Sequence, residues 1–217
     1  MSADSFRVDG PIGPLEAIFE GPETDAVAQP VVAVICHPLS TEGGSLHNKV
    51  VTMTARALRE SGVATVRFNF RSVGASVGSF DHGEGESDDL AAVVAEARQR
   101  FPGYELWLAG FSFGAYVAIR NARRLDAKYL ISIAPPVGRS WDFKALELPQ
   151  CPWLIIQGDA DEIVDPTKVY DWVESLQGLA EPPELVKVPE TTHFFHRRLM
   201  DLRGVIKHSI KRYLPGA

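Results

Sequence analysis

The sequence predicts an α/β protein built on a mostly parallel central sheet with helices on both faces. From Val31 onward, short β-branched runs alternate with amphipathic segments, which is the pattern of a parallel sheet wound by helices. The length of 217 residues allows one domain with a sizeable core. A hydrophobic content of 45% and a charged content of 23% are ordinary for a globular chain. We therefore expect a single domain over residues 1–217.

The first part of the chain does not follow this alternation. Between Phe6 and Glu20, the run Gly10-Pro11-Ile12-Gly13-Pro14 separates two short alternating stretches, which predicts an antiparallel hairpin. Residues 1–30 are therefore expected to form a hairpin at the edge of the sheet. The strands expected after it are Val31–Ile35, Val63–Phe70, Glu105–Ala109, Lys128–Ala134, Trp153–Gln157 and Glu184–Val188. The expected helices are His47–Ser61, Gly85–Phe101, Phe113–Leu125, Pro166–Leu176 and Phe194–Tyr213.

Charge and hydropathy exclude several classes of partner. The net charge of −6 disfavours nucleic acid and anionic membranes. The longest apolar runs have the length of a strand, well short of a membrane span. The polar and acidic start, Met1–Ser5, does not predict a leader segment. Cys36 and Cys151 cannot form a disulfide framework and are expected to be reduced thiols. We expect a cytoplasmic protein that acts on small molecules, and a homo-oligomer remains open.

The most informative motif is Gly110-Phe111-Ser112-Phe113-Gly114, which lies between a predicted strand and a predicted helix. A serine flanked by glycines at such a turn is typical of a nucleophile elbow, in which the turn raises the hydroxyl above the edge of the sheet. The glycines are needed because a larger side chain at either position would collide with the strand or the helix. The motif predicts that Ser112 is a nucleophile.

An acid and a histidine follow two later strands. Asp161 lies in the loop after Trp153–Gln157, and His193 lies in the loop after Glu184–Val188. Both positions fall at the carboxyl edge of an open α/β sheet. Ser112, Asp161 and His193 therefore occur in the order nucleophile, acid, base that is expected of a serine hydrolase triad. Asp159 is the rival acid and His196 is the rival base.

These motifs resemble those of the α/β-hydrolase superfamily, and the chain is most similar to small bacterial members related to dienelactone hydrolases and prolyl-oligopeptidase-like esterases. The resemblance runs from about Val31 to the end of the chain. Relatives more often carry a second His-Pro and a Tyr-Gly-Gly where this chain has Cys36 and Ser40–Gly44, so no substrate preference is carried over. The motifs that support it are Gly110–Gly114, Gly158-x-x-Asp161 with Val164, Thr192–Phe195, Cys36–Leu39, Gly43-Gly44, His47–Val51, Val66–Ser76 and Gly83–Glu86 with Asp88 and Asp89.

The resemblance also implies a place for a cap domain, which many superfamily members insert between the strands expected at Lys128–Ala134 and Trp153–Gln157. Only about eighteen residues separate those strands here, which leaves room for a loop and one helical turn. We therefore expect no cap and an open site.

The oxyanion hole requires two N–H donors. The amide of Phe113, directly after the nucleophile, is one candidate. The second is expected from the loop after Val31–Ile35, where Pro38 has no N–H and Leu39 is the first residue that can donate. His37 is interpreted as an organiser of this loop rather than a proton-transfer group.

Three further residues are candidates for binding substrate. Trp141 and Phe143 fall where a cap would begin, so they either line an acyl pocket or pack in the core. Arg71 either meets a substrate carboxylate or forms a buried ion pair with Glu86 or Asp88, and the ion pair is the simpler alternative.

No metal is expected at Asp81–Glu86, because these acids fit a solvated loop and a helix start better than a metal site. No other cofactor is expected. The sequence thus predicts a serine hydrolase, and most simply a carboxylesterase that acts on small soluble esters. The alternatives are a peptidase or amidase on short peptides, for which Arg71 or Glu42 could anchor a terminus, and a non-catalytic ligand-binding protein of the same fold.

Overall fold

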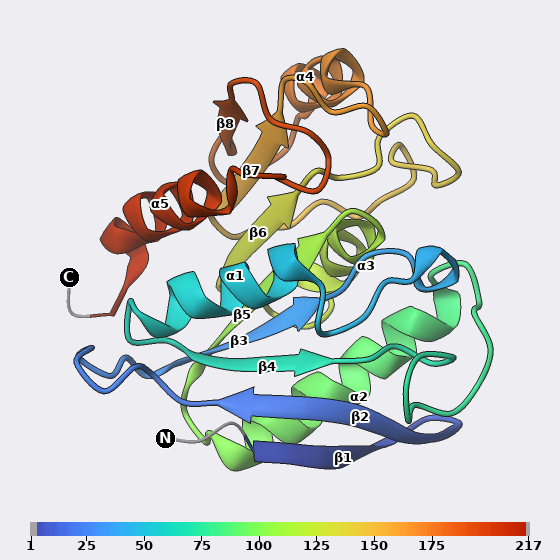
Figure 1. Ribbon diagram of the computed structural model, residues 1–217, viewed down its shortest axis with the longest axis vertical. Helices are drawn as coiled ribbons and strands as arrows, with labels where there is room; N and C mark the ends of the chain where they lie inside the picture. The colour runs from blue at the N-terminus through green and yellow to red at the C-terminus, as the bar shows by residue number, and fades with distance from the viewer. Residues whose placement is uncertain (1–3, 216–217) are drawn as a thin grey trace.

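A computed structural model describes residues 4–215, so residues 1–3 and 216–217 of the expected domain lie outside the described part (Figure 1). Its centre is an eight-stranded sheet in the order β1-β2-β4-β3-β5-β6-β7-β8. The two pairings of β2 are antiparallel and all other pairings are parallel. The strands are β1 (Asp4–Gly10), β2 (Gly13–Glu20), β3 (Val31–Cys36), β4 (Ala64–Phe68), β5 (Glu105–Phe111), β6 (Tyr129–Ile133), β7 (Trp153–Gly158) and β8 (Glu184–Val188).

Helices cover both faces of the sheet, as the alternation of strands and amphipathic runs predicts (Figure 1). The helices are α1 (Lys49–Arg59), α2 (Glu84–Arg100), α3 (Phe113–Ala122), α4 (Pro166–Ser175) and α5 (Leu199–Ile210). Apolar residues of α1 and α5 join one core cluster, and those of α2, α3 and α4 join the other. Because both faces are covered, β3, β4, β6 and β7 are buried along their whole length.

The antiparallel hairpin β1–β2 forms one edge of the sheet and pairs with β4. Charged side chains fix this hairpin to the parallel part of the sheet. The carboxylate of Glu20, at the end of β2, accepts hydrogen bonds from the guanidinium groups of Arg59 and Arg67. Glu16, also on β2, accepts from the side-chain amide of Asn69 and the backbone N–H of Ala75, on the loop after β4.

Two predicted boundaries are wrong in an informative way. β4 ends at Phe68 rather than Phe70, because Asn69 and the following residues turn into a loop held by Glu16. The last helix begins at Leu199 rather than Phe194. Phe195 and Arg197 have φ of 53° and 60°, a left-handed conformation that interrupts any helix through them.

The register of the sheet brings several loops to one edge. Cys36 of β3 is level with Gly110 of β5, and Gly158 of β7 is level with Val188 of β8. The loops that follow these strands therefore begin side by side at the carboxyl edge. Between β6 and β7 the described chain forms no helix and no strand, so no cap stands over this edge. In the described range 4–215, no helix combines the length and apolarity that crossing a membrane requires.

Candidate active site

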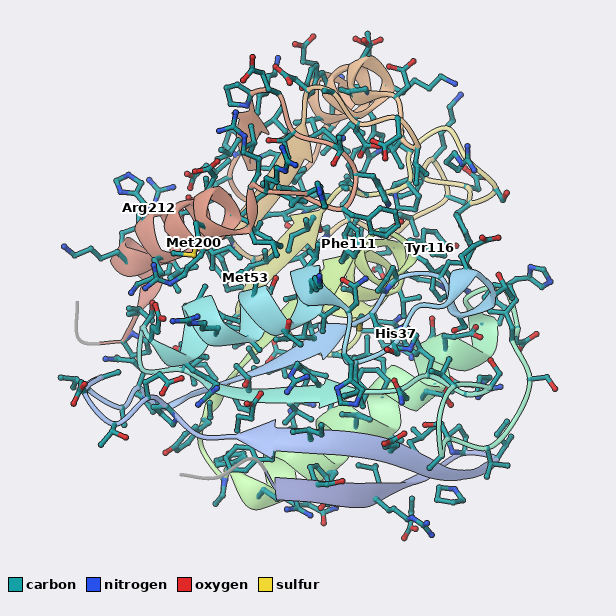
Figure 2. All side chains as sticks on the ribbon, viewed as in Figure 1. His37, Met53, Phe111, Tyr116, Met200 and Arg212 are labelled. Atoms are coloured by element: carbon teal, nitrogen blue, oxygen red, sulfur yellow. The ribbon has the colours of Figure 1, made fainter. Side chains whose placement is uncertain are left out.

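Ser112 occupies a sharp turn between β5 and α3. Its backbone has φ 53° and ψ −119°, an unusual conformation for a residue other than glycine. A Cβ on Gly110 would lie 2.2 Å from the carbonyl oxygen of Gly114, and a Cβ on Gly114 would lie 2.3 Å from the carbonyl oxygen of Cys36. Both contacts are with backbone, so the turn cannot form with larger residues at these two positions. Figure 2 shows Phe111 where β5 ends and Tyr116 on α3, on the two sides of this turn.

The structure brings Ser112, His193 and Asp161 together. The Nε2 atom of His193 lies 3.1 Å from Oγ of Ser112, and its Nδ1 lies 2.8 Å from Oδ2 of Asp161. A carboxylate only accepts, so Nδ1 carries the proton and Nε2 offers a lone pair to the serine hydroxyl. The imidazole is buried and lies against the ring of Phe111, with 5.0 Å between ring centroids. The three side chains form a continuous hydrogen-bonded chain that ends at the hydroxyl.

The carboxylate of Asp161 is saturated with donors. Oδ1 accepts from the backbone N–H groups of Ile163 and Val164, and Oδ2 accepts from His193 and from the side-chain amide of Gln157. Burial raises the pKa of Asp161, but the hydrogen bond to His193 and the two backbone donors outweigh it and bring this pKa below its ordinary value. Asp161 is therefore ionised at neutral pH.

The rival residues lie elsewhere. Asp159 is exposed, and its Oδ1 accepts from the backbone N–H of Glu190 at 2.6 Å. His196 is also exposed, on the turn before α5, where its backbone N–H reaches Oγ1 of Thr192 at 3.4 Å. Among the described residues, neither side chain contacts Ser112 or His193 through a hydrogen bond.

Backbone contacts hold the loops of Asp161 and His193 together. The carboxylate of Glu162 accepts from the backbone N–H of His193 at 3.1 Å. A Cβ on Gly158 would lie 2.2 Å from the carbonyl oxygen of Thr191, so the close approach of the two loops requires glycine there. The sequence interpretation missed the contacts of Glu162 and Gln157. Their closeness in sequence to Asp161 was the only signal that could have found them.

The loop after β3 also approaches Ser112. Leu39 and Phe113 have backbone N–H groups with no acceptor among the described residues, and Leu39 lines the same cavity as Ser112. His37 is buried, with Nδ1 donating to the carbonyl of Pro38 at 2.6 Å and Nε2 accepting from the backbone N–H of Phe70 at 3.1 Å (Figure 2). Burial lowers the pKa of His37 to about 4, so the ring is neutral and fixes the loop against the end of β4.

Known proteins of similar sequence and fold identify the family of this chain. The family model described as serine aminopeptidase, S33, matches residues 32–149, a range that includes Ser112. A solved α/β serine hydrolase without lid from Xanthomonas campestris is 59% identical, with a TM-score of 0.95 over 100% of this chain and 97% of its own. The chain belongs to the α/β-hydrolase superfamily of serine hydrolases. The predicted superfamily and the predicted fold without a cap are confirmed.

Two further relatives extend the match. An α/β serine hydrolase homologue from Coxiella burnetii is 41% identical, with a TM-score of 0.91 over 97% of this chain and 98% of its own. An uncharacterized protein of Rickettsia prowazekii is 38% identical over 149 residues, which are 67% of this chain. The match spans 63% of the length of that curated relative.

In this α/β-hydrolase a cavity of about 540 Å³ opens directly over Ser112 and His193. Glu42, Arg139 and Glu162 add charges around it. Trp141 lines the cavity, with its indole N–H donating to the carbonyl of His82 at 3.2 Å and its ring against Phe113. The apolar lining residues are Pro38, Leu39, Pro136, Trp141, Ile163, Val164 and Phe194.

Phe143 does not line this cavity, so its interpretation as a pocket residue is wrong. Its side chain is 6% exposed and packs between Tyr116 and Trp172, with ring centroids 5.5 and 5.0 Å away. The loop after β6 turns between Trp141 and Phe143, which sends one aromatic ring toward the site and the other into the core.

Arg71 forms a buried ion pair, the simpler of its two expected roles, so its interpretation as a substrate contact is wrong; the partner is Asp89 and not Glu86 or Asp88. Its guanidinium donates to both carboxylate oxygens of Asp89, at 2.8 and 3.0 Å, and its backbone N–H donates to the same side chain. Asp89 is completely buried. Glu86 instead accepts from the backbone N–H groups of Asp81 and Gly83 at the start of α2. The Arg71–Asp89 pair therefore braces the loop after β4 against α2.

We expect Arg71→Met to lower the free energy of unfolding by about 3–5 kcal/mol, because it leaves the carboxylate of Asp89 buried without its counter-ion. Urea unfolding measures the change. The exposed Asp88→Asn is the matched control and should cost less than about 0.5 kcal/mol. For the fraction of Arg71→Met that remains folded, the ratio of kcat/KM on an anionic ester to that on a neutral ester should equal the ratio of the wild type. A loss of activity on the anionic ester alone would show instead that Arg71 contacts the substrate.

Proposed function

We propose that this protein is a carboxylesterase that hydrolyses small soluble esters through an acyl-enzyme intermediate. The observation that carries the proposal is the hydrogen-bonded chain from Asp161 through His193 to the hydroxyl of Ser112, which opens into an uncapped cavity. Ser112 is the proposed nucleophile, His193 the general base and Asp161 the residue that holds the imidazole tautomer.

The chemistry follows from the positions of these atoms. Oγ of Ser112 forms a bond to the ester carbonyl carbon while its proton passes to Nε2 of His193. The resulting oxyanion accepts from the free N–H groups of Phe113 and Leu39. The carbon–oxygen bond to the alcohol then breaks, and the imidazolium returns its proton to the departing oxygen. Water repeats the sequence on the acyl-serine, releases the acid and restores Ser112.

The cavity supports a small or moderately sized substrate. Its volume of about 540 Å³ is open to solvent, and no cap is present to enclose a long chain. Trp141 and Leu39 supply apolar surface beside Ser112, so we assign them to the acyl side of the ester. We also propose a cytoplasmic location, because Cys36 and Cys151 are both free thiols.

A peptidase that acts on short peptides is the second candidate. Two observations favour it: the matching family model is described as a serine aminopeptidase, and the carboxylates of Glu42 and Glu162 lie on the cavity, where they could meet a free amine. The triad serves ester and amide alike, so the choice depends on what the cavity binds.

We expect p-nitrophenyl acetate and butyrate to give a burst of p-nitrophenolate equal to the enzyme concentration, because acyl-serine forms faster than water removes it. Stopped-flow absorbance measures the burst. The kcat/KM should fall for acyl chains longer than the cavity can hold and should be about 100-fold lower for aminoacyl anilides.

Matched substrates separate the candidates. Faster cleavage of an anilide with a free amine than of its N-acetylated counterpart, together with slow ester turnover, would favour the peptidase. Absence of turnover on every ester and anilide, with the protein folded, would leave the non-catalytic alternative.

A further inference from the structure

Gln157 is a buried amide behind the triad that the proposed mechanism does not use. It is the penultimate residue of β7 and is completely buried. Its side-chain nitrogen donates to Oδ2 of Asp161 at 3.0 Å and to the carbonyl oxygen of Gly158 at 3.2 Å. Its Oε1 has no hydrogen-bond partner among the described residues.

The orientation of this amide is determined by its neighbours. Exchanging the nitrogen and oxygen would place Oε1 against two acceptors, the carboxylate of Asp161 and the carbonyl of Gly158. The observed orientation uses both N–H donors and leaves the oxygen unpaired. A buried, unpaired amide oxygen costs free energy that an apolar residue of the same shape would avoid. The useful feature of Gln157 is therefore its pair of N–H donors, one of which is directed at Asp161; a polar side chain without them would bring no gain here.

We propose that Gln157 is a positioning residue of the triad, which fixes the plane of the Asp161 carboxylate and draws part of its negative charge away from His193. The inference rests on the proposed serine hydrolase function. Gln157 and Nδ1 of His193 share Oδ2, while the amides of Ile163 and Val164 hold Oδ1. Without Gln157, the imidazole is the only donor left on Oδ2.

Removing the donor has a defined effect on the histidine. The undivided charge on Oδ2 stabilises the imidazolium of His193 relative to the neutral ring. The neutral ring is the active base, so acid inactivates the variant more readily than the wild type. The acid limb of kcat/KM therefore moves to higher pH.

The other charged and titratable groups facing the pair stay in place. The loop after β7 supplies Asp159 and Glu162, and α4 supplies Tyr170, which faces Asp161. Lys187 of β8 lies over the ring of Tyr170, 3.8 Å from its centroid. Asp165 and Lys168 lie at the start of α4, on a second hollow that Asp161 also lines. None of these contacts the side chain of Gln157 through a hydrogen bond in the described part of the chain, so replacing it breaks no hydrogen bond of theirs.

The variant that tests the proposal is Gln157→Met, which keeps the length of the side chain and removes both donors. We expect kcat on p-nitrophenyl acetate to fall about tenfold with KM changed less than about twofold, and the acid limb of kcat/KM to rise by about half a pH unit. Asn121→Leu is the matched control, because Asn121 is another buried amide that donates twice, to Ser87 and to the carbonyl of Val117, within the helical layer. It should lower the melting temperature without moving the limb.

A double-mutant cycle with Asp161→Asn completes the test. If Gln157 acts through Asp161, adding Gln157→Met to Asp161→Asn lowers kcat no further. An unmoved acid limb with losses that add in the double variant would overturn the proposal and make Gln157 a packing residue only. Gln157→Leu serves as a second variant if the methionine protein does not fold. Retained activity in Ser112→Ala is a separate outcome, which would contradict the proposed function instead.

Discussion

Ser112→Ala is expected to lower kcat for ester hydrolysis by about 10⁴- to 10⁶-fold, with KM nearly unchanged. The alanine removes the oxygen that lies within hydrogen-bond distance of Nε2 of His193, while the proposed oxyanion donors, the amides of Phe113 and Leu39, remain. A fluorophosphonate should add once to the wild type, as seen by intact mass, and should not add to the variant.

The cavity offers a matched control for this result. Ser140 lines the same cavity but has no hydrogen bond to a histidine among the described residues. Ser140→Ala should therefore keep full labelling and turnover within about twofold of the wild type. A label that persists in Ser112→Ala, or that disappears in Ser140→Ala, would show that the nucleophile is assigned to the wrong residue.

The turn at Ser112 could be predicted from sequence because its causes are local. The two glycines avoid clashes of a Cβ with backbone atoms, either within the same five residues or at the neighbouring end of β3. A strand before the motif and a helix after it complete the pattern. Asp161 and His193 were predictable for a related reason. Each follows a strand of a parallel sheet, and parallel strands end at one edge, so order along the chain implies proximity in space.

Other parts of the site depend on contacts that no local pattern encodes. Glu86, Asp88 and Asp89 all lie in the first turns of α2, and only the orientation of the helix against the sheet makes Asp89 the partner of Arg71. The start of α5 is set by left-handed residues, Phe195 and Arg197, that carry no glycine or asparagine signal.

The directions of the two aromatic side chains in the loop after β6 could not be predicted from the sequence either. Trp141 and Phe143 are two residues apart in an irregular loop, so their opposite surroundings follow from tertiary packing alone. No periodicity applies to such a loop, and without a helical or strand repeat the side of each ring cannot be derived from its spacing.

Asp161→Asn is expected to lower kcat by about 10³- to 10⁴-fold, whereas Asp159→Asn should change it less than about threefold. Four donors converge on the carboxylate of Asp161: two backbone amides, the amide of Gln157 and Nδ1–H of His193. An asparagine NH₂ group must face one pair of them. If it turns toward Ile163 and Val164 it meets two N–H groups, and if it turns toward His193 it favours the tautomer with the proton on Nε2, which cannot accept from Ser112.

The hydrogen bonds of Asp159 explain why its replacement by asparagine should have little effect. Asp159 accepts one backbone N–H, from Glu190, and the carbonyl oxygen of asparagine can accept it equally well. Initial rates on p-nitrophenyl acetate across pH 5–9 compare the two variants, with circular dichroism to confirm that both are folded. Activity that survives in Asp161→Asn and is lost in Asp159→Asn would transfer the role of the acid to Asp159. Equal losses in both variants would mean that each substitution disturbs the backbone of the loop after β7, and would contradict the assignment of Asp161 alone as the acid.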